Sequence, residues 1–544
     1  MYSKKYAISE TSVVIPAIKK NVAFADDLIK KLNGISLVQR AINLAISFVE
    51  KSKVIVLTDS EEISLICRRN GVRFSLEPSL NIQSTDFLKD LRETLAQILS
   101  GFRSMVWLWP YSPMVTKSLL ESAFEKFQTT ECDYLFTVRE EDHRIYSKKG
   151  ASLHSLFNED QQRFLVEVRA FQIYSSEWLL GDRVSQSAQT LVLGEEFVEI
   201  KGYQDWWVCE KLLKKKRIVF HVIGYAEVGL GHLYRSLALA HEITDHEVHF
   251  LCTTRSRFAA NQIAGYEYPV ECVEESRLLE TLLSLKPDLI IHDVLNTQAS
   301  LIQGIQSQGI KTVCFEDLGE GGKRADLTIN ELYDDPLFEG KNVRWGHRYY
   351  FLRDEFLHAN VNHYTERVSS ILVTFGGSDP KNLTLRCVKA IFDYCRDRNI
   401  QIQIVTGPGY IHLEELQGWL KSKNSPILGH TNATGVISHI MEEVQVAISS
   451  NGRTVYELAH MNVPAIILPQ HEREKTHRFA RTNNGFYNLG LLDPGEFSSV
   501  LKNALVRLVE DIQFRKDLFR GMEKFDFSRN KTWVAQEIQA LLKE

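Results

Sequence analysis

One short stretch, residues 218–235, does most to limit what this chain can fold into. It reads Ile-Val-Phe-His-Val-Ile-Gly-Tyr-Ala-Glu-Val-Gly-Leu-Gly-His-Leu-Tyr-Arg, so an apolar, β-branched run stops at a glycine loop. Apolar residues then recur at helical spacing, and the glycines permit backbone angles that other residues resist. The pattern predicts a strand, a tight turn and a helix that begins at His232.

Such a turn suits an anionic ligand. It presents free backbone N–H groups and the positive end of a helix to an anion. His232 stands at its mouth with a side chain that moves protons near neutral pH. We therefore expect a phosphorylated ligand beside a catalytic histidine. The alternatives are a glycine turn that only lets the helix pack on the strand and a histidine that only caps a helix.

The chain is too long for one hydrophobic core. Its 544 residues correspond to roughly three or four domains. A hydrophobic content of 44% and a net charge of −5 describe an ordinary globular protein without the basic excess of a nucleic-acid binder. No stretch has the length of a membrane span, and the N-terminus lacks a signal-peptide core. We expect a cytoplasmic protein with neither a membrane span nor a nucleic-acid partner.

The eight cysteines are scattered, and none forms a Cys-x-x-Cys pair. Neither a disulfide framework nor a zinc site is predicted.

Strands and helices alternate in the first part of the chain, up to about residue 212. We expect strands at 12–17, 53–58 and 104–109 and helices at 28–48, 61–70 and 116–127. This alternation predicts a doubly wound parallel sheet with ligands at the carboxyl ends of its strands. A basic run at 214–217 is interpreted as a solvated junction between domains.

This first part resembles the cytidylyltransferases that activate acidic sugars such as sialic acid as CMP derivatives. The resemblance implies a nucleotidyltransferase-like, GT-A-like fold, with CTP and a CMP-sugar as ligands and magnesium as cofactor. The motifs that carry it are Val13-Val-Ile-Pro-Ala17, Leu32-Asn-Gly-Ile-Ser-Leu-Val38, Val54-Ile-Val-Leu-Thr-Asp-Ser-Glu-Glu-Ile63 and Leu108-Trp-Pro-Tyr-Ser-Pro-Met114.

Two departures argue against nucleotidyl transfer. Where the family has a glycine-rich triphosphate loop, residues 18–25 read Ile-Lys-Lys-Asn-Val-Ala-Phe-Ala. Where it has a magnesium-binding Ile-Asp pair, this chain has Ile200 and Lys201. Asp133 and Asp205 are interpreted as caps or surface residues. We expect a degenerate relative that keeps a sugar or nucleotide pocket or serves in assembly, and magnesium is left open.

Strands and helices alternate again after residue 216. Expected strands are 247–253, 288–292, 312–315, 400–406, 446–449 and 465–469, and a further strand runs from 370 into the turn at 376–378. Helices are expected at 277–285, 300–308 and 383–396. Two successive Rossmann-like halves that face one cleft predict the GT-B architecture, with the ligand between them.

The second part resembles the UDP-sugar hydrolase of the pseudaminic-acid pathway and its spore-coat polysaccharide relatives. These are themselves similar to the lipid-II-forming N-acetylglucosaminyl transferase. Seven motifs match in order: Gly229-Leu-Gly-His-Leu-Tyr-Arg235, Asp288-Leu-Ile-Ile-His-Asp293, Phe315-Glu-Asp-Leu318, Ala325-Asp-Leu-Thr-Ile-Asn330, Phe351-Leu-Arg-Asp-Glu-Phe356, Phe375-Gly-Gly-Ser-Asp-Pro380 and Ser450-Asn-Gly-Arg-Thr-Val-Tyr-Glu-Leu458.

Three of these motifs carry residues to which the sequence assigns a role. The resemblance puts His232 in the water-activating position. It implies that Glu457, in the first turn of a helix, accepts hydrogen bonds from the nucleotide ribose. The alternative is that the Glu457 carboxylate only interacts favourably with the helix dipole. The turns at 376–378 and 451–454 hold the diphosphate. The expected ligand contacts are Gly229, Gly231, Arg235, Asp293, Gly376, Gly377, Ser378, Asn451, Gly452, Arg453, Thr454 and Glu457.

This part departs from the family at two places that contact sugar or phosphate there. Asp293-Val-Leu295 stands for Asp-His-Tyr, and His471-Glu-Arg-Glu-Lys-Thr-His477 stands where an Asn-Gln pair is usual. The identity of the sugar, and whether water or an alcohol attacks, stays open.

Three functions follow from the sequence. The first is hydrolysis of a UDP-linked deoxy amino sugar to free sugar and UDP, without a metal or other cofactor, in nonulosonic-acid or surface-polysaccharide synthesis. The second is a GT-B glycosyltransferase, and the third is a non-catalytic sugar-nucleotide scaffold. Expected domain limits are 1–212, 213–366 and 367–544, and a homodimer is left open.

Overall fold

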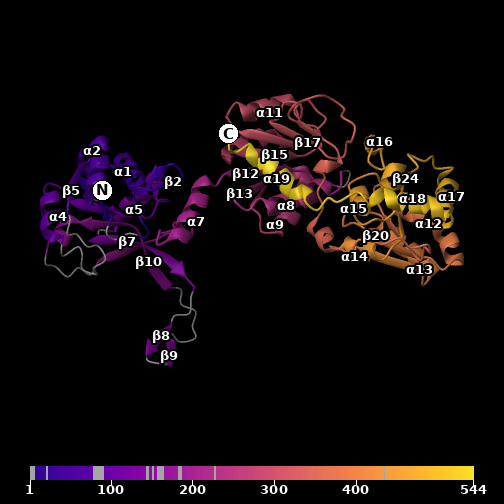
Figure 1. The fold of residues 1–544 in the computed structure, drawn as a ribbon, viewed down its shortest axis with the longest axis horizontal. Coiled ribbons are helices and arrows are strands. Elements are labelled where there is room, and N and C mark those ends of the chain that lie inside the picture. Colours follow the sequence, from indigo (N-terminus) through magenta and orange to yellow (C-terminus); the bar gives the residue numbers. More distant parts are fainter. Residues whose placement is uncertain are drawn as a thin grey trace. The chain divides into compact units, whose positions relative to one another are not determined.

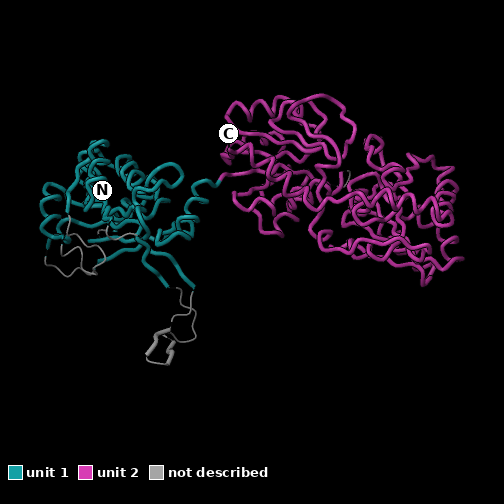
Figure 2. The backbone as a smooth tube through the Cα atoms, in the orientation of Figure 1, with its two compact units in different colours: residues 1–215 teal, residues 216–544 magenta. Residues whose placement is uncertain are grey.

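The computed structural model describes residues 6–19, 23–77, 91–130, 132–142, 146–149, 152–155, 164–181, 187–225, 228–433 and 435–543. The chain divides into two compact units, residues 1–215 and 216–544, which Figure 2 colours separately. Each unit is a layered α/β structure, described by itself below. The three domain limits expected from the sequence stay a prediction.

The first unit is built on one mixed sheet. In its described part the sheet has seven strands, in the order β11 (Ala188–Val192), β7 (Tyr134–Glu141), β10 (Phe164–Ser175), β6 (Ser104–Leu108), β1 (Thr11–Ala17), β4 (Val54–Thr58) and β5 (Arg73–Leu76). A further pair, β8 (Tyr146–Lys149) and β9 (Ser152–Ser155), forms a separate two-stranded sheet.

Helices cover both faces of this sheet, as expected for a doubly wound domain (Figure 1). Helices α1 (Leu37–Phe48), α2 (Glu61–Asn70), α5 (Lys117–Thr129) and α7 (Tyr203–Lys214) contribute to the core on one face. Helices α4 (Arg92–Ile98) and α6 (Ser176–Leu180) contribute to the core on the other face.

The expectation of an all-parallel sheet in this unit is wrong for one strand. Strand β10 pairs antiparallel with both β6 and β7, whereas the other pairs are parallel. A parallel neighbour needs a crossover connection, usually a helix. The segment between β7 and β10 instead carries the β8–β9 pair, so the chain returns in the opposite direction.

The helix expected at 28–48 starts nine residues later, at Leu37. Asn33 and Gly34 have positive φ angles of 48° and 80° and turn the chain between β2 (Lys31–Leu32) and β3 (Ile35–Ser36). The Ser36 hydroxyl then accepts a hydrogen bond from the Gln39 N–H at 3.3 Å and caps the helix.

The second unit holds two parallel sheets. The first contains, among described residues, β14 (Val270–Val273), β13 (Glu247–Thr253), β12 (Arg217–Val222), β15 (Leu289–Asp293), β16 (Lys311–Phe315), β17 (Leu327–Asn330) and β18 (Val343–Trp345), in that order. Its helices are α8 (Gly231–Glu242), α9 (Arg257–Ala264), α10 (Leu278–Ser284) and α11 (Ala299–Gln306).

The second of these sheets runs in the order β21 (Leu428–Asn432), β20 (Gln401–Thr406), β19 (Ser370–Thr374), β22 (Val446–Ser449), β23 (Ala465–Ile467) and β24 (Phe486–Asn488). Its helices are α12 (Leu383–Asp397), α13 (Leu413–Lys423), α14 (Ile437–Glu442), α15 (Thr454–His460), α16 (Glu472–Lys475), α17 (Phe497–Glu510) and α18 (Ile512–Met522).

The last helix, α19 (Asn530–Ala540), returns to the half that contains the first of these two sheets. Val534, Ala535 and Ile538 are buried in the core that α8 and β12 also form, and α19 lies beside α8 (Figure 1). The chain therefore crosses between the two halves twice. The expected fold class, a nucleotidyltransferase-like domain followed by a GT-B-type pair of Rossmann-like halves, is confirmed.

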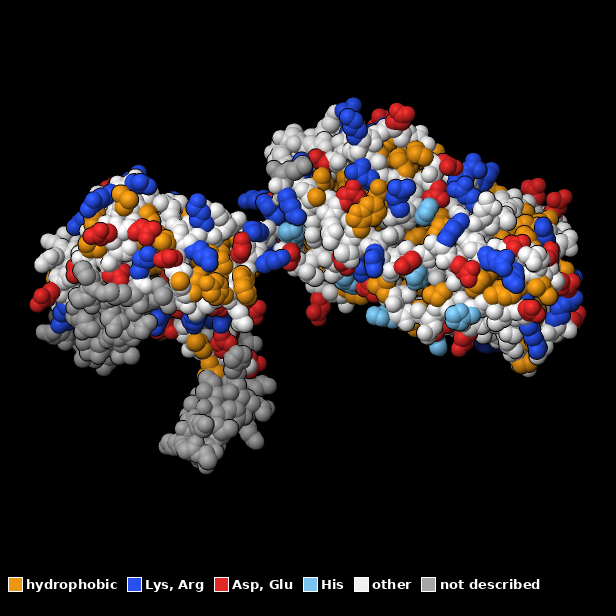
Figure 3. Space-filling view, in the orientation of Figure 1, with side chains coloured by type: hydrophobic (Ala, Val, Ile, Leu, Met, Phe, Trp, Pro, Cys, Tyr) orange, Lys and Arg blue, Asp and Glu red, His pale blue; other side chains and the backbone are white. Residues whose placement is uncertain are grey.

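The surface and the cysteines are unexceptional. Side chains of both charge signs are interspersed over the face of the second unit that Figure 3 shows. All eight cysteines, each at a described position, are free. None of the helices that the structure describes is long and apolar enough to cross a bilayer.

Candidate functional site

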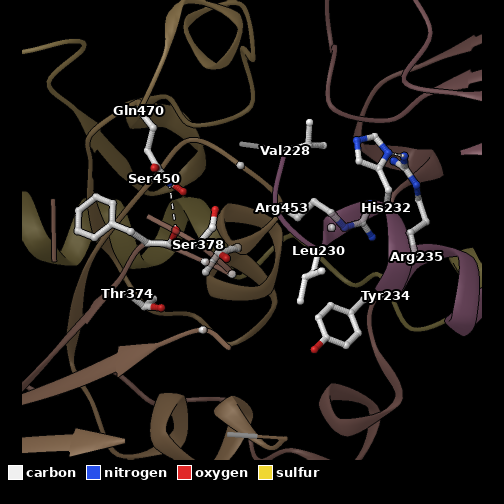
Figure 4. A pocket seen from close by; sticks show the side chains of 18 of the residues that line it. Val228, Leu230, His232, Tyr234, Arg235, Thr374, Ser378, Ser450, Arg453 and Gln470 are labelled. Atoms are coloured by element: carbon white, nitrogen blue, oxygen red, sulfur yellow. Dashed lines mark hydrogen bonds between the residues drawn. The ribbon is translucent and has the colours of Figure 1, made fainter. Parts of the chain in front are cut away.

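A cavity of about 480 Å³ lies between the two halves of the second unit. Loops that follow β12, β15 and β16 form one wall, and loops that follow β19, β20, β22 and β23 form the other. The carboxyl ends of parallel strands meet at one edge of a sheet, so two facing sheets bring these loops to one cleft. Figure 4 shows side chains from both walls.

The glycine turn after β12 lies against the opposite wall. Gly229 has a φ of 79°, and a Cβ at this position would lie 3.7 Å from the Ser378 hydroxyl. A Cβ on Gly231, where α8 begins, would lie 3.4 Å from the Arg453 side chain. Small residues here let the two halves approach closely. The helix starts one residue earlier than the sequence predicts.

His232 faces this cavity and is held by a carboxylate. Its Nδ1 lies 2.7 Å from Asp293 Oδ1, at the end of β15, and its side chain is 12% exposed. Although burial acts against it, the Arg235 guanidinium keeps the pKa of Asp293 far below its usual value, so the carboxylate only accepts hydrogen bonds. Nδ1 therefore carries the ring hydrogen, and Nε2 keeps its lone pair. Burial lowers the pKa of His232, which the Asp293 contact partly offsets.

Asp293 also anchors its surroundings. It accepts hydrogen bonds from Arg235 Nε at 2.9 Å and from the Ser236 hydroxyl at 2.9 Å, and a second Arg235 nitrogen contacts Oδ1. Its side chain is 1% exposed and is absent from the cavity wall. The structure therefore places Asp293 behind His232, whereas the sequence analysis placed it against the ligand.

A buried chain of charges joins His232 to the opposite wall. Arg235 NH1 donates to Glu331 Oε1 at 2.9 Å, and Arg453 makes an ion pair with the same oxygen. Arg453 lies in the half that contains the second of these sheets, and its side chain extends towards His232 and Arg235 (Figure 4). Burial lowers the pKa of Arg453 to about 9, and the neighbouring Arg235 contributes. Glu331 thus neutralises two cations, one from each half.

The turn after β19 presents unused donors to the cavity. Gly376, with a φ of 76°, Gly377 and Ser378 line it, and no described residue accepts a hydrogen bond from their backbone N–H groups. The N-terminus of α12 is already capped, because Asp379 accepts from the N–H groups of Leu383 and Thr384 at 2.9 and 2.8 Å. The donors available to an anion are therefore those of the turn.

Glu457 lies in the first turn of α15, as the sequence predicts, and is 6% exposed. Its Oε1 accepts a hydrogen bond from Arg353 Nε at 3.0 Å, and Arg353 also pairs with Glu355 at 2.7 Å. Both Arg353 and Glu457 line the cavity. The arginine fixes the direction of the Glu457 carboxylate and leaves Oε2 for other partners.

Eleven of the thirteen residues expected at the site line the cavity: Gly229, Gly231, His232, Arg235, Gly376, Gly377, Ser378, Gly452, Arg453, Thr454 and Glu457. Asp293 and Asn451 do not. The Asn451 amide donates to the carbonyls of Glu474 and His477 at 2.7 and 3.0 Å, so it holds the loop after β23.

The sequence analysis gave no individual role to several residues that reach the cavity, although it placed the segment 471–477 where the family contacts sugar or phosphate. Glu316 follows β16 and has a φ of 54°, and Arg473 and Glu474 belong to the short helix α16. Arg473 crosses between the halves, donating to the Glu316 carbonyl at 2.6 Å and to the Tyr333 hydroxyl at 3.0 Å. Glu316, Arg473 and Glu474 all follow parallel strands, and this position could have marked them as candidate site residues. Among described residues, no cluster of three or more His, Cys, Asp and Glu side chains is arranged to hold a metal ion.

No protein-family model matches this chain. It is 28% identical over 270 residues to the uncharacterized protein MJ1062 of Methanocaldococcus jannaschii, covering 46% of this chain and 55% of that protein. The chain thus spans about half the length of this relative. It is 26% identical over 311 residues to the spore coat polysaccharide biosynthesis protein SpsG of Bacillus subtilis, covering 55% of this chain and 90% of SpsG.

A further relative is the UDP-2,4-diacetamido-2,4,6-trideoxy-β-L-altropyranose hydrolase of Campylobacter jejuni, 24% identical over 250 residues, with 44% of this chain and 87% of the hydrolase covered. Similar solved structures include MurG from Acinetobacter baumannii, with a TM-score of 0.44 and 15% identity over 60% of this chain and 99% of that one. CMP:2-keto-3-deoxy-manno-octonic acid synthetase has a TM-score of 0.29 and 13% identity over 38% and 98%. The expected resemblance to a UDP-sugar hydrolase and its spore-coat relatives has counterparts in the Campylobacter jejuni hydrolase and SpsG.

Proposed function

We propose that the second unit hydrolyses the bond between a deoxy amino sugar and the diphosphate of UDP, releasing free sugar and UDP, in nonulosonic-acid or surface-polysaccharide synthesis. The observation that carries the proposal is the His232–Asp293 pair at 2.7 Å, which faces a cavity whose opposite wall is the turn at 376–378. The names of two relatives, a UDP-sugar hydrolase and a spore-coat polysaccharide protein, support sugar-nucleotide processing.

His232 supplies the base in this reaction. With Nδ1–H donated to Asp293, Nε2 accepts a proton from a water molecule as the water oxygen bonds to the anomeric carbon. The bond from that carbon to the diphosphate oxygen breaks, and its electron pair leaves with UDP. Asp293 stays ionised and stabilises the imidazolium that forms, because the Arg235 guanidinium lies beside it.

The opposite wall holds the leaving group. The N–H groups of residues 376–378, which line the cavity, donate to the diphosphate as negative charge accumulates on it, and Arg453 adds a cation. UDP leaves readily with these contacts and needs no further acid. The free Oε2 of Glu457 accepts from the ribose hydroxyls. These contacts bind a nucleoside diphosphate without a metal ion.

The first unit does not transfer nucleotides in this proposal. The Lys19 ammonium, one of two cations retained from the family's triphosphate loop, pairs with Asp26 at 3.0 Å and Glu62 at 3.1 Å; the other, Lys20, lies outside the described residues. Lys201, where the family has a carboxylate, pairs with Glu199 at 3.3 Å, and Asp205 accepts from its N–H at 2.8 Å. These contacts favour a binding or assembly role.

The test is nucleotide release from a panel of UDP-sugars incubated with the whole protein, in the absence of any acceptor. We expect UDP and free sugar from one of them, and a roughly 10²- to 10⁴-fold lower kcat for His232→Asn. His363→Asn, at an exposed histidine, is the matched control and keeps full activity.

Two results would contradict the proposal. UDP release that requires an added sugar acceptor would instead assign a glycosyltransferase. Tight binding of UDP-sugars without turnover, unaffected by His232→Asn, would assign a scaffold. A parallel incubation with CTP and acidic sugars, followed by pyrophosphate detection, tests the first unit, for which we expect no product.

A further inference from the structure

Glu474 is a buried carboxyl group on the diphosphate side of the cavity. It belongs to α16, lines the cavity together with Ser450, Gly452 and Gln470, and is only 7% exposed. A buried carboxylate is normally paired with a cation. Its surroundings therefore decide its charge.

The two oxygens of Glu474 have different environments. Oε2 accepts hydrogen bonds from the backbone N–H groups of Gln470 and Asn451, at 2.6 and 3.4 Å. Oε1 accepts none from any residue that the structure describes, and a Cβ on Gly452 would lie 3.6 Å from it. Gly452 itself forms part of the cavity wall. Oε1 is thus the oxygen directed to the ligand side.

No lysine or arginine nitrogen lies within 4 Å of this carboxyl in the described part of the chain. The titratable and charged groups that face it are Lys381, whose charge acts from a distance, His471, whose Nε2 is 3.9 Å from Oε1, and His477 beyond Asn451. Arg473 of the same helix is directed to Glu316 and Tyr333.

Burial without a paired cation changes the titration of this group. It raises the pKa of Glu474 to about 7, partly offset by the two backbone donors. A carboxylate next to a diphosphate would repel it, whereas a carboxylic acid has one O–H to donate. The histidines nearby do not remove this conflict, because burial lowers the pKa of both His471 and His477.

We propose that Glu474 binds the diphosphate as a neutral acid, donating a hydrogen bond from Oε1 to a phosphate oxygen, so that binding of UDP takes up one proton from solvent at Glu474. This inference rests on the proposed function, since it requires a nucleoside diphosphate in the cavity. It adds a pH-dependent contact at a segment, residues 471–477, where this chain departs from the family.

Isothermal titration calorimetry of UDP binding at pH 8, in two buffers of different ionisation enthalpy, measures proton uptake directly. At this pH UDP itself is fully ionised, since its terminal phosphate has a pKa of about 6. A carboxyl with a pKa near 7 is about 90% ionised at pH 8, so we expect about 0.9 proton taken up per UDP bound. Affinity should fall up to about tenfold between pH 7.5 and 8.5.

Glu474→Gln separates this contact from other sources of protons. Its amide donates without titrating, so UDP binding persists and proton uptake at pH 8 disappears. His471→Asn, which removes the nearest other titratable group, retains the uptake. Circular dichroism of each variant checks folding.

The outcomes distinguish the two proposals. Binding of UDP by the wild-type protein at pH 8 without proton uptake overturns the role of Glu474 and leaves the proposed function intact. Uptake that survives Glu474→Gln, or that is lost in His471→Asn, overturns it as well. Failure of the wild-type protein to bind UDP at all overturns the proposed function itself.

Discussion

The loops that follow the first strand of each unit differ, and the difference shows what the end of a strand does and does not determine. Both β1 and β12 are buried strands with a neighbour on each side in their sheets, and each leads into a loop at its carboxyl end. After β12 the loop contains Gly229 and leads into α8, which begins at Gly231 and carries a histidine held by a carboxylate. After β1 the loop carries Lys19, whose charge is matched by two acidic side chains.

A sheet therefore fixes where a loop begins, and the side chains around the loop decide what it does. His232 is oriented because the neighbouring strand β15 ends in Asp293, in register with Val222 of β12. Lys19 has Asp59 in the corresponding place, after the neighbouring strand β4, but that carboxylate accepts a hydrogen bond from the Lys19 backbone N–H at 2.7 Å. The same geometry orients a histidine in one unit and closes a loop in the other.

The largest effect is expected for Asp293→Asn. The amide can donate to His232 Nδ1, which moves the ring hydrogen to Nε2. This removes the lone pair that accepts the proton from water in the proposed reaction. We expect kcat for UDP release to fall roughly 10²- to 10⁴-fold, as in other enzymes that depend on an oriented histidine.

A variant that keeps a carboxylate serves as the control. Asp293→Glu keeps the charge but moves it, so its activity should lie between the wild-type protein and the amide variant. Wild-type turnover by Asp293→Asn would show that the His232–Asp293 hydrogen bond is only structural. The difference between the loops after β12 and β1 would then say nothing about function.

Glu331→Gln should cause the next largest change, in stability. Glu331 is fully buried and accepts from Arg235 and Arg453 through one oxygen, so the amide leaves two buried guanidinium groups short of one negative charge. Breaking a buried pair in this way costs roughly 3–5 kcal/mol. Urea denaturation measures the free energy of unfolding. Glu472→Gln, at a residue that is 79% exposed, should change it by less than about 0.5 kcal/mol.

Much of the fold follows from local sequence signals. The strands expected at 247–253 and 446–449 and the helix at 61–70 match β13, β22 and α2 residue for residue. Apolar runs bounded by polar residues, and a serine directly before a helix, are signals that lie within a few residues of the element they define. The helix expected at 28–48 was wrong because its apolar pattern continues through the turn at Asn33 and Gly34.

The site was predictable only in part, because side-chain direction depends on distant residues. The glycine turns and His232 come from contiguous motifs and do line the cavity. Asp293 also belongs to a motif, but whether it meets the ligand or His232 depends on the register of β15 against β12, which no single motif encodes. Glu331 joins Arg235 and Arg453 across 96 and 122 residues of sequence and carries no local signal.

Two buried histidines near the ends of β12 and β15 should make the second unit sensitive to acid. His221 and His292 are buried side by side with their Nδ1 atoms 3.1 Å apart, and burial lowers the pKa of His221 to about 4 and that of His292 well below its usual value. An unfolded histidine titrates near 6.5, so below that pH the unfolded chain binds protons that the folded pair does not. The free energy of unfolding should therefore fall as pH drops from about 6.5 towards 4.

The expected slope is up to roughly 1.4 kcal/mol per pH unit for each of these histidines. Denaturant midpoints at pH 7.5, 6 and 5 measure it, and the double variant His221→Leu/His292→Leu should flatten the dependence. Equal slopes for both proteins would show that other groups cause the loss of stability in acid.

Glu457→Gln should weaken binding of the UDP-sugar with little change in chemistry. In the proposed complex the carboxylate, directed by Arg353, accepts from the ribose. Loss of one charged hydrogen bond worth about 1.5 kcal/mol should raise KM roughly tenfold at unchanged kcat. A 2′-deoxyribose analogue of UDP provides the control. The wild-type protein should bind UDP more tightly than this analogue, and the variant should bind the two alike. A preference that survives in Glu457→Gln would assign ribose recognition to another group.

The smallest effect is expected at the end of β1. Lys19→Met removes an ammonium that is held by Asp26 and Glu62, two partners that are 65% and 57% exposed. Surface pairs of this kind contribute about 0–1 kcal/mol, so the free energy of unfolding should change little, and UDP release by the second unit should not change. If the first unit transfers nucleotides, however, the same lysine binds the triphosphate, and Lys19→Met abolishes pyrophosphate formation from CTP. Pyrophosphate made by the wild-type protein and lost in this variant would show that Lys19 exchanges its acidic partners for the nucleotide. The loops after β1 and β12 would then both support catalysis and would differ only in the ligand that they bind.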